Sequence, residues 1–225
     1  MSVREVQTAA ARVVHVDRLN DAALQELRSR FSYHPLDLEA LLSAAVEPTC
    51  TAYADYAFMT LLWPEATTGD IRTIRFFVDR QTLTIIGDTS TQIIKHTIDT
   101  VHASLGSKES QLPPVGVVHE LLARLRAEWN DDSVAMTTTL QTRFRGNAQV
   151  IRQFGRWCQA QQLSEFVPHI IIDAHACDGL AERRVVAPLA TETQNTDATL
   201  PSLMRTYAVA SAVMVVVVLV TLSVQ

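Results

Sequence analysis

The sequence predicts an α/β (α+β) domain followed by one transmembrane helix. Short runs of alternating or β-branched apolar residues, typical of strands, are interspersed with segments whose apolar residues recur at helical spacing. Residues 206–224 differ from both, because they contain no charged residue and consist mostly of Val, Ala, Leu and Met. The chain has 225 residues, of which 48% are hydrophobic and 19% charged, which is enough for a folded core and unlike a disordered protein.

The first predicted elements are a strand over 12–16 and two helices. Asn20 or Asp21 suits the N-cap of the first helix, because its side-chain oxygen accepts a bond from an exposed backbone N–H. Pro35 suits the first turn of the second helix. The apolar residues at helical spacing in the two helices are Leu24, Leu27, Phe31, Leu38, Leu41, Leu42 and Ala45.

The middle of the chain predicts an antiparallel meander and then two more helices. Strands are expected over 53–63, 71–78 and 82–86, joined by the short connections that antiparallel pairing allows. Helices are expected over 91–104 and 115–129. The resulting order, β-α-α-β-β-β-α-α, predicts a sheet flanked by helices.

The pattern is weaker after Trp129, where a helix around 147–161 and a strand over 166–173 are expected. Residues 133–164 contain no acid and four arginines, which form either a solvated helix face or a contact with anionic lipid headgroups. These arginines are Arg143, Arg145, Arg152 and Arg156.

The apolar run 206–224 approaches the length of about 20 residues that a helix needs to cross a bilayer. A buried, Val-rich core segment is the alternative. Arg183, Arg184 and Arg205 precede the run and place the N-terminal domain in the cytoplasm by the positive-inside rule. The absence of a secretory signal pattern and the wide spacing of the three cysteines agree with that side. We therefore expect a single-pass membrane protein whose N-terminal domain is cytoplasmic.

The chain accordingly divides into four predicted parts. They are an α/β domain over 1–130, a helical and strand region over 131–187, a linker over 188–204 and a transmembrane helix over 205–225. The linker is assigned because it is polar, rich in Thr and bounded by Pro.

Three segments resemble the N-terminal cytosolic domain of the CorA family of magnesium transporters. Phe31–Leu42 is similar to the family's His-Pro-Leu turn, which precedes an acidic, Leu-rich helical turn. Tyr53–Leu62 is similar to its Tyr-Asp-Asp-Tyr-Leu-Phe strand. Ile71–Thr73 and Phe76–Ile86 are similar to the hairpin that follows, although the turn here is Asp79-Arg80 where the family often has Gly-Lys or Gly-Asn.

The resemblance covers 12–129, roughly half of the chain. It implies an α/β/α sandwich with a mixed or antiparallel sheet, assembly into a homo-oligomer (a pentamer in the family), and Mg²⁺ as a transported or regulatory ion. The family's Gly-Met-Asn motif and second transmembrane helix are not found in this sequence. We therefore expect a membrane-anchored, CorA-like protein of divalent metal ion transport that is incomplete or non-conducting alone. The alternative is a tail-anchored binding, scaffold or regulatory module that retains the fold without transport.

Asp173, His175 and Cys177 are the candidate metal ligands, because alternation in a strand puts all three on one face. Oxygen, nitrogen and sulfur donors of this kind bind transition metals, whereas the alternative is an ordinary strand end with a polar turn. No Gly-x-Ser-x-Gly, dinucleotide-binding or P-loop pattern occurs, so no catalytic or cofactor-binding residue and no enzyme activity is predicted. The net charge of −5 argues against nucleic acid as a partner.

Overall fold

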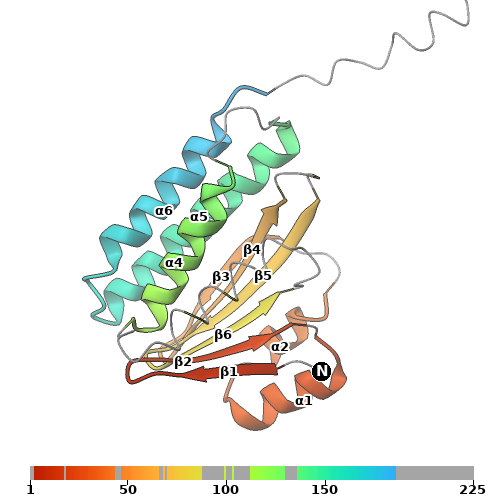
Figure 1. Cartoon of the computed structure of the whole chain (residues 1–225), viewed down its shortest axis with the longest axis vertical. Helices are drawn as coiled ribbons and strands as arrows, with labels where there is room; N and C mark the ends of the chain where they lie inside the picture. The colour runs from red at the N-terminus through yellow and green to blue at the C-terminus, as the bar shows by residue number, and fades with distance from the viewer. Residues whose placement is uncertain are drawn as a thin grey trace, which may run out of the picture. The chain divides into compact units, whose positions relative to one another are not determined.

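Six strands form one mixed sheet between two layers of helices (Figure 1). The computed structural model describes residues 3–17, 19–43, 47–65, 68, 70–87, 99, 103, 112–129 and 136–185. The sheet has the order β1-β2-β6-β5-β4-β3, with β2 and β6 parallel and every other neighbouring pair antiparallel. The elements are β1 (Val3–Gln7), β2 (Arg12–Val16), α1 (Asp21–Arg30), α2 (Pro35–Ala40), β3 (Thr49–Ala52), β4 (Ala57–Pro64), β5 (Ile71–Val78), β6 (Thr82–Gly87), α4 (Pro114–Ala127), α5 (Thr138–Ala160) and α6 (Val167–Ala181).

Alternation along the strands supplies a separate apolar core to each face of the sheet. Met59 and Phe76 point to the face covered by α4, α5 and α6, where the larger core lies. Phe58 and Phe77, which adjoin Met59 and Phe76 in sequence and pair with each other across β4 and β5, point to the face covered by α1 and α2. The predicted α/β architecture with a sheet flanked by helices is confirmed.

Local chemistry explains why the first two helices begin where they do. Asn20 caps α1 by accepting a hydrogen bond at Oδ1 from the Ala23 backbone N–H at 2.8 Å. Pro35 opens α2, and the ring of His34 accepts a bond from the Leu36 N–H at 3.3 Å. The predicted starts of both helices are confirmed, although α2 ends at Ala40, before Leu41 and Leu42 of the predicted helix.

Side chains from the helices complete the hydrogen bonding of β4 where its neighbour β3 has ended. β3 pairs with β4 only as far as Thr60. Beyond that point, Asn147 of α5 accepts a bond from the Leu62 N–H at 3.0 Å and donates one to the Leu62 carbonyl at 2.8 Å. Trp129 donates from Nε1 to the carbonyl of Pro64 at 2.9 Å. Buried backbone groups need such partners, so these contacts fix α4 and α5 on the sheet.

Two expectations for the second half of the chain are wrong. The segment predicted as a strand over 166–173 lies in the helix α6, which packs against α4 and α5. The region predicted as separate, 131–187, contributes α5 and α6 to the same core as the sheet, and residues up to Val185 form one compact unit. α5 is also longer than the predicted 147–161, and the edge strands β1 and β3 were not predicted.

Several expectations fall on parts of the chain outside the described residues. They are the linker over 188–204, the transmembrane helix over 205–225 and nearly all of the helix over 91–104. In the part of the chain that the structure describes, no helix has both the length and the apolar composition that crossing a membrane requires.

Candidate functional site

A buried carboxylate, Asp37 of α2, is held by two tyrosine hydroxyls from the segment between β3 and β4. Tyr56 donates to Oδ2 at 2.7 Å and Tyr53 donates to Oδ1 at 3.1 Å. The Tyr56 oxygen also accepts a bond from the backbone N–H of His34 at 2.8 Å. Burial raises the pKa of both tyrosines, which keeps the hydroxyls protonated and able to donate. This Asp37 cluster therefore joins α2 to the sheet through neutral donors.

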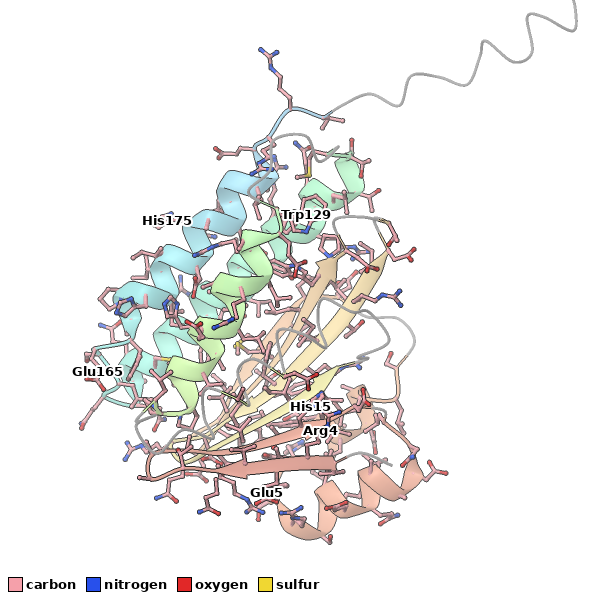
Figure 2. All side chains as sticks on the ribbon, in the orientation of Figure 1. Arg4, Glu5, His15, Trp129, Glu165 and His175 are labelled. Carbon is pink, nitrogen blue, oxygen red and sulfur yellow. The ribbon has the colours of Figure 1, made fainter. Side chains whose placement is uncertain are left out.

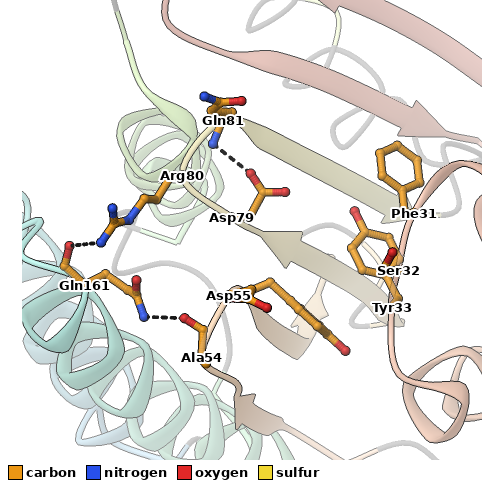
Figure 3. A pocket seen from close by; sticks show the side chains of 10 residues that line it. Phe31, Ser32, Tyr33, Ala54, Asp55, Asp79, Arg80, Gln81 and Gln161 are labelled. Carbon is orange, nitrogen blue, oxygen red and sulfur yellow. Dashed lines mark hydrogen bonds between the residues drawn. The ribbon is translucent and has the colours of Figure 1, made fainter.

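Stacked rings extend the Asp37 cluster toward an open pocket. Tyr33 stacks on Phe77 with ring centroids 4.0 Å apart, and its hydroxyl is hydrogen-bonded to Thr84 at 2.9 Å. Phe31 stacks on the same tyrosine at 5.1 Å. The pocket beside these rings has a volume of about 620 Å³ (Figure 3). Its lining residues are Phe31, Ser32, Tyr33, Ala54, Asp55, Tyr56, Asp79, Arg80, Gln81 and Gln161.

The polar rim of this pocket is mostly engaged in bonds within the protein. Arg80 donates to the carbonyl of Gln161 at 3.3 Å, and the Gln161 side chain donates to the carbonyl of Ala54 at 2.7 Å (Figure 3). Asp79 accepts from the backbone N–H groups of Gln81 and Thr82 at 2.7 and 2.6 Å. The rim thus connects the β5–β6 turn with the end of α5 and the segment before β4.

A second buried carboxylate, Asp173 of α6, is held by charged and titratable groups of α4. The Arg126 guanidinium donates to Oδ1 at 2.6 Å, and Nδ1 of His119 lies 2.7 Å from Oδ2. The ring of His169 lies 5.0 Å from that of His119. Burial raises the pKa of Asp173 above its ordinary value, although the hydrogen bond with His119 and the positive charge of Arg126 offset part of that rise. We name these four residues the Asp173 cluster.

The structure does not bring the three predicted metal ligands together. In the helix, Asp173 and Cys177 lie one turn apart on the buried side, each 1% exposed, whereas His175 is exposed on the other side. Burial raises the pKa of the Cys177 thiol to about 12, which disfavours the thiolate that binds metals. Within the described residues, no group of three or more His, Cys, Asp or Glu side chains has an arrangement that could hold a metal ion. The strand geometry on which that prediction depended is wrong.

The partners of Asp173 were not singled out in the sequence. His119 and Arg126 lie 54 and 47 positions away from Asp173, so local spacing gives no sign of the contact. One signal was present: the two residues are seven positions apart in a predicted helix and therefore share a face. Nothing in the sequence, however, indicated which helix this face would meet.

Comparison with solved structures identifies the fold. The complete structure of the CorA magnesium transporter from Methanocaldococcus jannaschii is similar with a TM-score of 0.54 and 9% identity, covering 92% of this chain and 75% of that one. The full-length CmaX protein is similar with a TM-score of 0.52 and 15% identity, and the match covers 89% of this chain and 72% of CmaX. The ZntB cytoplasmic domain from Vibrio parahaemolyticus is similar with a TM-score of 0.51 and 13% identity, and the match covers 78% of this chain and 84% of that domain. This chain has a CorA-type fold.

At these identities the likeness to CorA, CmaX and ZntB shows the fold alone. No protein-family model and no curated protein matches the sequence. The CorA resemblance of Phe31–Leu42 and Tyr53–Leu62 is nevertheless confirmed at the level of fold, and these segments supply Asp37, Tyr53 and Tyr56. In this CorA-type domain, the residues that carry the resemblance are those that connect α2 to the sheet.

Proposed function

We propose that this chain is a membrane-anchored protein of divalent metal ion transport whose described residues form its cytoplasmic domain. The observation that carries the proposal is the three-layer fold shared with the CorA magnesium transporter and the ZntB cytoplasmic domain. Residues 206–224 supply the anchor, because an uncharged run of this length suits a membrane-spanning helix.

The finer parts of the proposal come from the sequence. The anchor is a single pass with the N-terminal domain in the cytoplasm, and the chain assembles into a homo-oligomer, a pentamer by family resemblance. Mg²⁺ is the transported or regulatory ion. The chain has no enzymatic role, and it does not conduct ions alone, since no Gly-Met-Asn occurs in its sequence. Light scattering of the detergent-extracted chain tests the oligomer, and a monomer contradicts it.

Cation uptake by cells tests the proposal directly. Deletion of the gene is expected to change the uptake of at least one divalent cation, measured with Mg²⁺, Zn²⁺, Co²⁺ and Mn²⁺. The intact gene restores uptake, whereas a matched variant lacking 206–224 does not. The purified full chain in liposomes is expected to give no flux by itself. Unchanged uptake of all four cations in the deletion strain contradicts a transport function.

A second candidate function, a tail-anchored binding or scaffold module, is favoured by the outer side of α6. Ile171 and Ile172 are 43% and 55% exposed there, as in a surface that meets a partner. Unchanged cation uptake, together with a defined protein complex recovered with the full chain and lost on Ile172→Asp, supports this candidate over transport.

A further inference from the structure

The solvent face of α5 carries a row of arginines. Arg145, Arg152 and Arg156 are spaced by seven and four residues, which places all three on one side of the helix. Arg145 and Arg156 are exposed and form no ion pair with any described residue, while Arg152 pairs with Asp178 of α6. The sequence from 133 to 164 contains no acid that offsets this positive charge.

The neighbouring helix α6 exposes large apolar side chains. Its buried side packs on α4 and α5 through residues such as Ile170, Ala174 and Cys177. Its outer side presents Ile171 and Ile172, which are 43% and 55% exposed. Two adjacent isoleucines with this much exposed surface are the kind of apolar feature that contacts a partner or a membrane.

The arginine row and the isoleucines belong to one continuous surface. α5 and α6 lie side by side, as Figure 1 shows, and make the most extensive helix–helix contact among the described elements. A Cβ built on Gly155 of α5 would lie 3.3 Å from Ile170, and the ion pair of Arg152 with Asp178 bridges the two helices. Figure 2 shows His175 on α6 and Glu165 near the turn between the helices, both exposed. We call the combined α5–α6 surface the outer face.

We propose that the outer face docks on the surface of a bilayer that contains anionic phospholipids. Arginines attract anionic headgroups, and apolar side chains beside them enter the boundary between headgroups and acyl chains. Ile171 and Ile172 suit the apolar part of a bilayer and offer no donors to nucleic-acid phosphates, so the isoleucines favour lipid over nucleic acid as the anionic partner. The inference rests on the proposed function in one respect: the membrane anchor holds the domain close to the bilayer on which the outer face docks.

Quenching of an introduced tryptophan by brominated lipid tests the docking. The three native tryptophans are at most 4% exposed, so brominated lipid is expected to quench the fluorescence of the introduced surface tryptophan and not theirs. The full-length Ile172→Trp variant is reconstituted into vesicles of brominated phosphatidylcholine, with or without phosphatidylserine. Full-length Leu36→Trp is the matched control, because Leu36 is 65% exposed on α2, across the sheet from the outer face.

We expect strong quenching of the tryptophan at position 172 in vesicles with phosphatidylserine and little at position 36. Adding Arg145→Gln and Arg156→Gln to the Ile172→Trp chain lowers the docked-to-undocked ratio about five-fold per arginine, about 25-fold together. Arg28→Gln on α1, far from the outer face, leaves the ratio unchanged. Circular dichroism confirms that each variant is folded.

Three results overturn the inference. They are equal quenching at the two positions, quenching that does not depend on phosphatidylserine or the arginines, and arginine-dependent binding of duplex DNA without quenching. Flotation with neutral vesicles separates this inference from the proposed function. A chain that floats without quenching retains the anchor and loses the docking, whereas a chain that floats only with phosphatidylserine retains the docking and loses the anchor.

Discussion

The two sides of the sheet stabilise a buried carboxylate in different ways. On the α1–α2 side, Asp37 is 5% exposed and accepts bonds from the neutral hydroxyls of Tyr53 and Tyr56. On the α4–α6 side, Asp173 is 1% exposed and lies between Arg126 and His119. The first arrangement depends on hydrogen-bond geometry and the second on opposite charge. The two sides should therefore respond differently to mutation, salt and pH.

The largest effect is expected from Asp173→Ala. Removal of the carboxylate leaves Arg126 and His119 without their common partner at a buried position. Breaking a fully buried ion pair costs about 3–5 kcal/mol, and the partial exposure of both partners lowers our expectation to about 2–4 kcal/mol. Urea unfolding of the full chain in detergent measures this loss. Asp173→Asn is the matched control for shape, and a loss below about 1 kcal/mol for Asp173→Ala would contradict a charge-dependent cluster.

Tyr56→Phe tests the other side of the comparison. The variant loses the hydroxyl that donates to Asp37 and accepts from the His34 N–H, so we expect a loss of about 1–2 kcal/mol. Tyr53→Phe is the control with a smaller expected effect, because it removes one longer bond at a half-buried position. The cost of Tyr56→Phe should stay constant when about 0.5 M NaCl is added, since neutral donors are not screened. A cost that falls with salt would show that charge also controls this side.

The segments that form the Asp37 cluster could be recognised in the sequence, whereas the Asp173 cluster could not be anticipated. The Asp37 cluster comes from Phe31–Leu42 and Tyr53–Leu62, two short segments whose residue patterns resemble a known family. β5 was predicted to the residue, because Ile71–Val78 is rich in β-branched and aromatic residues and lies between two polar turn segments. The partners of Asp173 come instead from a helix about 50 positions earlier, and only tertiary packing joins them.

α6 shows why local propensity misled the prediction. Three consecutive isoleucines, Ile170 to Ile172, favour a strand when read alone. The wider pattern of Ile170, Ala174 and Cys177 follows helical spacing, and these residues pack on α4 and α5. Burial of that stripe outweighs the β propensity of the isoleucines. The error then carried over to the candidate metal ligands, since strand and helix place His175 on opposite sides relative to Asp173.

A third carboxylate, Glu128, extends the comparison because its charged neighbour is Glu65. Burial and this like charge raise the pKa of Glu128 from 4.5 to about 7. The folded chain therefore favours the protonated form, and the resulting stability is present below about pH 4.5 and lost as pH rises through about 7. Glu128→Gln should stabilise the chain by about 1 kcal/mol at about pH 8, after allowance for solvent screening, and by little at about pH 4.5.

Denaturation across this pH range measures the difference for Glu128→Gln. Glu120→Gln on the same helix is the matched control, because Glu120 pairs with Arg124 and should lose a little stability at high pH. A Glu128→Gln chain whose stability follows pH in parallel with the native chain argues against protonation at this position.

The smallest effect is expected from Asp178→Asn, which isolates burial as the deciding variable. Asp178 lies five residues after Asp173 on α6 and also pairs with an arginine, Arg152 of α5. Its side chain is 29% exposed and that of Arg152 is 40% exposed, compared with 1% for Asp173. Exposed pairs contribute about 0.2–1 kcal/mol, so we expect a loss of about 0.5 kcal/mol that disappears in about 0.5 M NaCl. A loss equal to that of Asp173→Ala would mean that charge pairing, independent of burial, stabilises the contact between α6 and its neighbours.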